Sequence, residues 1–230
     1  MAMSAKKDIW NLVASAVSAA DRILLFGPPG TGKTTAGVRA GDPGEVYKIT
    51  LHEEMPAATL EGHFMPDGDK FVWHDGLAIR AWKDGARLVL DEIDRASGDA
   101  LTLLYAILDD PDLAALTLPT GQTVYPAEGF TVVATMNGEP EDLPEALRDR
   151  FEVAIEVTEP HPEAIKSLDS DLQRAAKETT AVDDPSRRAS VRSWKAFERL
   201  RTEMGEEMAA QAVFGHRGQA VLDSLKIARS

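Results

Sequence analysis

The sequence predicts an α/β fold in which a five-stranded, mostly parallel sheet is covered by helices and followed by a small helical domain. Two observations support this prediction. Short apolar, β-branched runs recur along the first two thirds of the chain with helix-compatible stretches between them, which is typical of parallel sheets. After Pro160 and Pro162 the pattern becomes helical, and the residue before a proline is pushed out of helical geometry. We therefore expect an α/β core over residues 1–159 and a helical domain over residues 160–230.

Five apolar runs are the expected strands of the sheet, and one segment between them has a clear helical period. The runs are Arg22–Phe26, Val46–Thr50, Arg87–Asp91, Phe130–Thr135 and Val153–Val157. In the segment 99–108 apolar residues recur at i, i+3, i+4 and i+7, which predicts an amphipathic helix packed on the sheet. These core-facing residues are Leu101, Leu104, Tyr105 and Leu108.

Two inserts interrupt the alternation and are expected to protrude as hairpins. The first, at about residues 58–74, has two short arms around Pro66-Asp67-Gly68-Asp69, with aromatic residues beside the turn. The second places a turn at Thr120-Gly121 between an arm with Leu116 and an arm with Val124. Packing of the aromatic side chains onto the core is the alternative interpretation of the first insert.

Composition excludes several classes of protein. The chain has 230 residues, 43% of them hydrophobic, which is enough for a packed core. It has no apolar run of the roughly 20 residues that span a bilayer, and its first ten residues lack the apolar core of a signal peptide. With no cysteine there are no disulfides or thiolate metal sites. We therefore expect a cytoplasmic protein.

The chain is acidic, with 25 basic and 38 acidic residues and a formal charge of −13. This balance disfavours non-specific attraction to nucleic acid. A basic cluster does occur near the carboxyl end, where a solvated helix face is the usual explanation. Its members are Arg187, Arg188, Arg192, Lys195, Arg199 and Arg201.

A phosphate-binding loop, GPPGTGKT, follows directly after the first apolar run and precedes a helix-compatible segment. Its glycines allow successive backbone N–H groups to face one anion, its lysine supplies a charge for the β- and γ-phosphates, and the next threonine offers a hydroxyl to Mg²⁺. ATP with Mg²⁺ is therefore the expected cofactor. The candidate binding residues are Gly27, Pro28, Pro29, Gly30, Thr31, Gly32, Lys33, Thr34 and Thr35.

Polar residues end two further apolar runs. In RLVLDEID, Asp91 is expected to hold Mg²⁺ together with Thr34, and Glu92 to polarise the attacking water. In VVATMN, Asn137 is expected to reach the γ-phosphate or the water, because its amide can both donate and accept. The alternatives are surface acids after a strand and, for Asn137-Gly138, a simple turn.

With these motifs in this order, the chain resembles an AAA+ ATPase, a P-loop NTPase with a helical lid. Within that group it is similar to the MoxR and dynein-related branch. The supporting segments are Thr59-Leu60-Glu61-Gly62, GLAIRAWKDGARLVLDEIDRAS from Gly76, and LPEALRDRF from Leu143. The resemblance implies that the first insert is the helix-2 insert of that branch.

The resemblance also implies roles for four arginines. Arg150 matches an arginine finger that enters a neighbouring subunit's site, and Arg148 is the alternative. Arg192, in Ser190-Val191-Arg192-Ser193, matches the second sensor, in which the family usually has proline at the place of Val191. Arg95 matches a position that senses the adjacent subunit. Without the resemblance, helix-end arginines meeting the helix dipole or nearby acids would be the preferred interpretation of Arg148 and Arg150.

The predicted function is therefore Mg²⁺-dependent ATP hydrolysis by a homo-oligomeric ring, by resemblance a hexamer, that remodels or activates a client protein. The resemblance implies a von Willebrand factor A domain protein as a partner. A nucleic-acid-directed motor and a non-hydrolysing nucleotide switch are the two alternatives. The five histidines have no metal-ligand spacing, so Mg²⁺ bound with nucleotide is the metal we expect.

Overall fold

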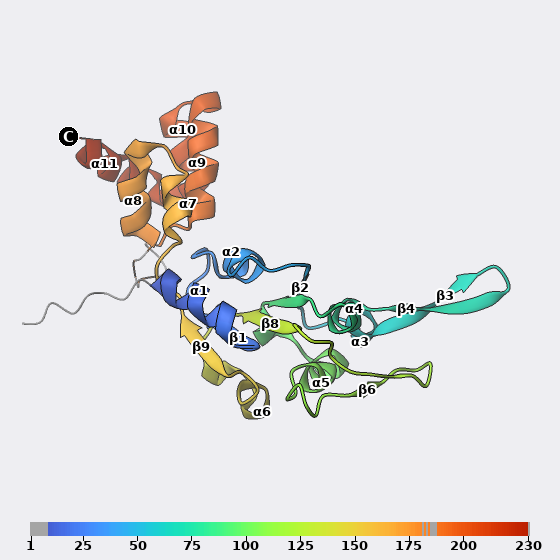
Figure 1. The fold of residues 1–230 in the computed structure, drawn as a ribbon. Coiled ribbons are helices and arrows are strands. Elements are labelled where there is room, and N and C mark those ends of the chain that lie inside the picture. The colour runs from blue at the N-terminus through green and yellow to red at the C-terminus, as the bar shows by residue number, and fades with distance from the viewer. Residues whose placement is uncertain (1–8, 181, 183, 185–187, 230) are drawn as a thin grey trace, which may run out of the picture. The chain divides into compact units, whose positions relative to one another are not determined.

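A five-stranded parallel sheet forms the centre of the first part of the chain (Figure 1). The computed structural model describes residues 9–229 apart from 181, 183 and 185–187. The strands lie in the order β2-β5-β8-β1-β9, and all neighbours are parallel. Their bounds are β1 Arg22–Phe26, β2 Val46–Thr50, β5 Arg87–Asp91, β8 Thr131–Thr135 and β9 Val153–Glu156. The predicted sheet is confirmed, and each strand matches its apolar run to within one residue at either end.

Side chains alternate between the two faces of the sheet, and each face is covered by helices. Leu88 and Leu90 belong to the main core cluster with residues of α4 and α5. Val89 and Val133 face the opposite way, toward Gly37 of α2, where an added Cβ would lie 3.2 Å from a methyl group of each valine. Glycine at this position lets α2 lie close to the sheet, since a Cβ would require the valines to shift by a few tenths of an ångström.

The described residues of this part of the chain form the α-helices α1 Ile9–Ala19, α2 Lys33–Arg39, α3 Ala57–Glu61, α4 Leu77–Asp84, α5 Gly98–Ile107 and α6 Glu145–Arg148. The predicted helix at 99–108 is α5, but its buried face differs from the predicted one. Leu104 and Leu108 are buried, whereas Leu101 and Tyr105 are only partly buried, and Leu103 and Ile107 complete the buried face. The apolar face of α5 therefore also includes Leu103 and Ile107, which are buried in the core together with Leu104 and Leu108.

Both inserts are hairpins, as predicted. The first pairs β3 Gly62–Asp67 with β4 Lys70–Asp75 and extends away from the sheet (Figure 1). The second pairs β6 Leu116–Thr117 with β7 Thr123–Val124. In the first hairpin Trp73 packs partly against the core, and the edge of Phe64 meets it at 5.1 Å between ring centroids, whereas Phe71 is 74% exposed. Packing onto the core therefore explains one aromatic residue and not Phe71.

The remainder of the described chain is helical. Its helices are α7 Pro162–Lys166, α8 Ser170–Thr180, α9 Val191–Met204, α10 Glu206–Phe214 and α11 Gly218–Arg229. They enclose a second core in which the rings of Trp194, Phe197 and Phe214 lie 5.2–5.9 Å apart. None of the helices in the described part of the chain is long and apolar enough to span a membrane.

The chain divides into two compact units. The first contains residues up to Gly27 together with Lys33–Glu156, and the second contains Pro28–Gly32 together with the residues from Val157 onward. The predicted domain boundary after residue 159 stays a prediction. The sequence also predicts an interruption of the helical pattern at Val182-Asp183-Asp184-Pro185, and this segment lies partly outside the described residues.

The helical unit should depend on Trp194, which is fully buried and whose Nε1 donates to Thr179 Oγ1 at 2.9 Å. We expect Trp194→Ala to lower the free energy of unfolding of this unit by about 3–5 kcal/mol, because it leaves a large cavity. Denaturant unfolding followed by circular dichroism measures this. Exposed Lys195 on the same helix provides the control, since Lys195→Ala should change stability by no more than about 0.5 kcal/mol. Equal effects of the two variants would contradict this prediction.

Candidate functional site

The candidate site lies at the carboxyl ends of β1, β5 and β8, where parallel pairing brings the polar ends of β5 and β8 to the same edge of the sheet as the end of β1. Lys33 begins α2, directly after the phosphate-binding loop, and is only 5% exposed. Its Nζ donates to the carbonyl oxygen of Gly27 at 2.8 Å and to Oδ1 of Asn137 at 3.2 Å. The two residues predicted from separate motifs are therefore in contact.

The carboxylate of Asp91 is the most heavily hydrogen-bonded group of the site. Thr34 Oγ1 and Thr135 Oγ1 each donate to Asp91 Oδ1 at 2.6 Å. Lys48 Nζ lies 3.4 Å from Asp91 Oδ2. Burial raises the pKa of Asp91, but the hydrogen bonds from Thr135 and Thr34 and the charge of Lys48 outweigh burial and hold that pKa below its ordinary value. Asp91 is therefore ionised at neutral pH.

Glu92 follows Asp91 in an unusual backbone conformation. Its φ of 59° and ψ of 52° are left-handed, and Glu92 is one of two described non-glycine residues with positive φ. This conformation costs roughly 1–2 kcal/mol. It allows a 3₁₀ turn, Ile93–Arg95, to begin directly after Glu92. Arg95 Nε lies 3.0 Å from Glu92 Oε2, and because both side chains are well exposed, this ion pair is weak.

The middle of the phosphate-binding loop, Pro28–Gly32, groups with the helical unit. The carbonyl oxygen of Thr31 accepts from the backbone N–H of His161 at 3.1 Å. Gly30 has a φ of 80°, and a Cβ at this position would collide with the side chain of Ser190. Ser190 caps α9 by accepting from the N–H of Ser193 at 3.1 Å. Glycine at position 30 is therefore required both by its backbone conformation and by this close packing.

Two further candidate residues, one in the loop and one in the second sensor, are exposed to solvent. Thr35 is exposed on α2, and Arg192 is exposed in the first turn of α9. The role of Arg192 as the second sensor stays a prediction. In the described part of the chain, no three acidic or histidine side chains gather as a metal cluster.

The two finger candidates differ in how firmly their own chain binds them. Arg150 donates to the carbonyl oxygens of Tyr105 at 2.9 Å and Ala146 at 2.6 Å, and its guanidinium lies 5.1 Å from the centre of the Tyr105 ring. Arg148 makes a long ion pair of 3.9 Å with Glu141. The side chain of Arg148 is 38% exposed and that of Arg150 is 27% exposed. Arg148 is thus the freer of the two arginines.

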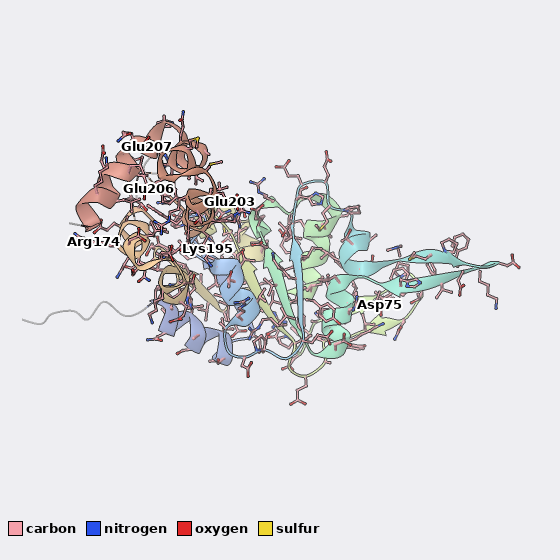
Figure 2. The ribbon with its side chains drawn as sticks, turned by 90° about the horizontal axis from the view of Figure 1, so that it is seen from above. Asp75, Arg174, Lys195, Glu203, Glu206 and Glu207 are labelled. Atoms are coloured by element: carbon pink, nitrogen blue, oxygen red, sulfur yellow. The ribbon has the colours of Figure 1, made fainter. Side chains whose placement is uncertain are left out.

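The basic cluster near the carboxyl end does not form a uniform basic surface. Arg201 pairs with Asp169 at 2.6 Å and Asp171 at 2.7 Å. Figure 2 shows Lys195 on the same helical unit as Glu203, Glu206 and Glu207, so that charges of both signs mix there. Arg187 lies outside the described residues. A solvated helix face explains this cluster better than a nucleic-acid surface.

The contacts of Thr135 and Lys48 to Asp91 were not predicted from the sequence. Thr135 lies two residues before Asn137 in the same motif. It was not singled out because a threonine at the end of a buried strand is usually a core residue whose hydrogen bonds are satisfied within the protein. Lys48 is on β2, which carried no motif. Only the strand order shows that both flank β5 and therefore reach Asp91.

The residues present fit a nucleotide with Mg²⁺. Asp91 is an ionised carboxylate, Thr34 adds a hydroxyl, and hard oxygen ligands suit Mg²⁺. Lys33 supplies a buried ammonium at the end of a loop whose Gly27, Gly30 and Gly32 all have positive φ. Such a loop, between a buried strand and a helix, is the structure that cradles phosphates. The fold and the site together define a P-loop nucleotide-binding domain.

Comparison with known families specifies the class further. The family described as AAA domain (dynein-related subfamily) matches residues 22–151, more than half of the chain, and the chain belongs to this family. The predicted resemblance to the MoxR and dynein-related branch of AAA+ ATPases is thereby confirmed.

Curated relatives agree with this membership. The chain is 35% identical to Protein NorQ of Paracoccus denitrificans over 148 residues, which is 61% of this chain and 53% of NorQ. It is 30% identical to Denitrification regulatory protein NirQ of Pseudomonas aeruginosa over 128 residues, 55% of this chain and 49% of NirQ. The chain therefore spans about half the length of these relatives.

A solved structure supports the fold alone. A RuvB mutant from Thermotoga maritima superimposes with a TM-score of 0.51 at 20% identity, and the match covers 95% of this chain and 68% of that chain.

Proposed function

We propose that this domain binds ATP with Mg²⁺ and hydrolyses the ATP as part of a homo-oligomeric ring of six copies that acts on a partner protein. One observation carries the proposal of hydrolysis. Lys33 bonds to Asn137 and Thr34 bonds to Asp91, so that residues from three motifs meet at one edge of the sheet with Glu92 beside them. Membership of the AAA family supports it.

Each residue of the site has a definite task in this proposal. Lys33 and the N–H groups of the loop bind the phosphates. Thr34 and Asp91 would hold Mg²⁺, which would neutralise phosphate charge. Glu92 accepts a proton from a water molecule as its oxygen bonds to the γ-phosphorus. The bond from that phosphorus to the β–γ bridging oxygen breaks, and ADP and inorganic phosphate are released. Asn137 orients the water or the γ-phosphate.

The weak ion pair between Glu92 and Arg95 is compatible with this task. Both side chains are partly exposed, and exposed ion pairs contribute only about 0–1 kcal/mol. Glu92 can therefore exchange Arg95 for a water molecule at little cost. The left-handed backbone of Glu92 fixes the direction in which its side chain leaves the strand end.

Replacing Glu92 tests hydrolysis. We expect Glu92→Gln to lower steady-state ATP turnover by about 10²–10⁴-fold, because glutamine cannot accept the proton, while ATP binding is retained. Phosphate release measures turnover, and a fluorescent ATP analogue measures binding. Glu128, an exposed acid on the loop before β8, provides the control, and Glu128→Gln should retain full turnover. Unchanged turnover in Glu92→Gln would refute the proposed role of Glu92.

The proposed assembly follows from Arg150 and Arg148, which come from the motif that supplies the finger in similar proteins. We propose that one of them enters the site of the neighbouring copy. The internal bonds of Arg150 to Tyr105 and Ala146 must break for this, whereas Arg148 has only a long ion pair to release. The sequence match favours Arg150, and the local contacts favour Arg148.

Mixing variants tests action in trans. We expect Arg150→Ala to lower turnover by roughly 10³–10⁵-fold and to regain part of it when mixed with Lys33→Ala, because a mixed ring contains sites with both residues. Arg148→Ala, mixed in the same way, decides between the two arginines. Size-exclusion chromatography with light scattering verifies that mixed assemblies form. Mixed assemblies in which neither arginine variant recovers would exclude action in trans.

The proposed partner is a client protein, and the von Willebrand factor A domain is the class that the family resemblance implies. The name of NirQ describes that relative as a regulatory protein, which supports a regulatory role here. The acidic balance of this chain and the mixed charges around Lys195 disfavour nucleic acid as the partner.

A capture experiment tests the existence of a client. We expect Glu92→Gln protein held in ATP to retain a client, because a ring that cannot hydrolyse ATP does not complete its cycle. Lys33→Ala protein, which should not bind ATP, is the control. Mass spectrometry of the captured proteins is the measurement. Identical captured proteins with both variants would contradict an ATP-dependent client.

A further inference from the structure

Asp91 is held by a hydroxyl outside the recognised phosphate-binding and acidic motifs. Thr135, the last residue of β8, is 2% exposed and its Oγ1 lies 2.6 Å from Asp91 Oδ1. Because Asp91 is ionised, Thr135 must be the donor in this hydrogen bond. The bond joins the ends of two central strands, since Leu90 of β5 is paired with Ala134 of β8 one residue earlier.

Three features make Thr135 suitable for fixing a carboxylate. Its hydroxyl is buried, so water does not compete for the bond. Its side chain branches at Cβ, which restricts χ1 in a strand. Its partner atom is the same oxygen that accepts from Thr34, so the two hydroxyls together fix the orientation of the carboxylate around that oxygen.

The surroundings of the second oxygen are different. Lys48 Nζ lies 3.4 Å from Asp91 Oδ2, and the side chain of Lys48 is 42% exposed. Thr50 Oγ1 is at 3.5 Å from the same oxygen, the limit of a hydrogen bond. These contacts are longer and more solvated, so they fix the carboxylate less firmly than Thr135 does.

We propose that Thr135 is a positioning residue that holds Asp91 in place for Mg²⁺, and that its hydroxyl sets the Mg²⁺ affinity of the nucleotide-bound domain. The proposal rests on the proposed nucleotide site. Groups that orient a metal-holding carboxylate in this way change metal affinity about 10–100-fold when they are removed. Thr135 is buried and its hydroxyl donates to Asp91, so it acts through Asp91.

Mg²⁺ titration of the full chain with bound ADP tests the proposal. A fluorescent ADP analogue is bound in EDTA, and its signal is followed as free Mg²⁺ rises. We expect Thr135→Val to raise the Mg²⁺ dissociation constant about tenfold or more, with ADP affinity in EDTA unchanged. Thr135→Ser retains the hydroxyl and should stay within about threefold of the unmodified chain. Thr135→Ala replaces the valine variant if the latter does not fold.

Thr131 gives a matched control, because it lies at the opposite end of β8 and Thr131→Val makes the same chemical change. It should leave the Mg²⁺ affinity within about twofold. Two outcomes overturn the role of Thr135: an unchanged Mg²⁺ dissociation constant in Thr135→Val, or an equal loss of ADP affinity in EDTA, which indicates a purely structural effect. A failure of the proposed function is distinguishable, because the unmodified chain would then not bind ADP or would show no response to Mg²⁺.

Discussion

The parallel alignment of β5, β8 and β1 is the constraint on which the candidate site depends. In parallel neighbours the carboxyl ends meet at one edge, so Asp91, Thr135 and the loop after Phe26 are brought together by the backbone alone. If one of these strands ran in the opposite direction, its carboxyl end would lie at the opposite edge of the sheet, one strand length away. Main-chain hydrogen bonds therefore position the site before any side chain contributes.

This edge of the sheet holds opposite charges in a partly dry environment. Lys33 and Asp91 are both largely buried, and burial alone disfavours each charge. Asp91 is kept ionised by hydroxyl donors and a lysine, whereas Lys33 bonds to a carbonyl and an amide oxygen. The partial charge of a carbonyl or amide oxygen stabilises an ammonium group less than the full charge of an anion does. A phosphate group bound at the loop would add an anionic partner for Lys33.

Much of the fold could be predicted because the signals are local. The five apolar runs became strands, and the turn residues Gly68 and Gly121 lie in hairpins. The prediction for α5 was incomplete. Leu101 and Tyr105 do pack against the core, but Leu103 and Ile107 fit a helical period equally well and are more deeply buried, which only packing decides. Local patterns cannot say which of several apolar faces the sheet covers.

The candidate site was predictable where one motif supplies both the residue and its task, as for Lys33 and Glu92. Thr135 and Lys48 were missed because their importance depends on the identity of the neighbouring strand, which no run of residues encodes. The same limit applies to the arginines. The sequence places Arg148 and Arg150 near the end of a short helix, but it does not show that Tyr105 and Ala146 accept hydrogen bonds from Arg150.

The glycine at position 30 shows how a motif residue can have two functions. Its positive φ is the reason that sequence reasoning gives for glycine, since it lets the loop turn its N–H groups toward one point. The structure adds a second reason, because Ser190 fills the space that a side chain would need. Thr31 is also bonded through its backbone to His161, immediately before α7. The loop is therefore attached to the beginnings of α7 and α9, and neither helix end can shift far from it without breaking these contacts.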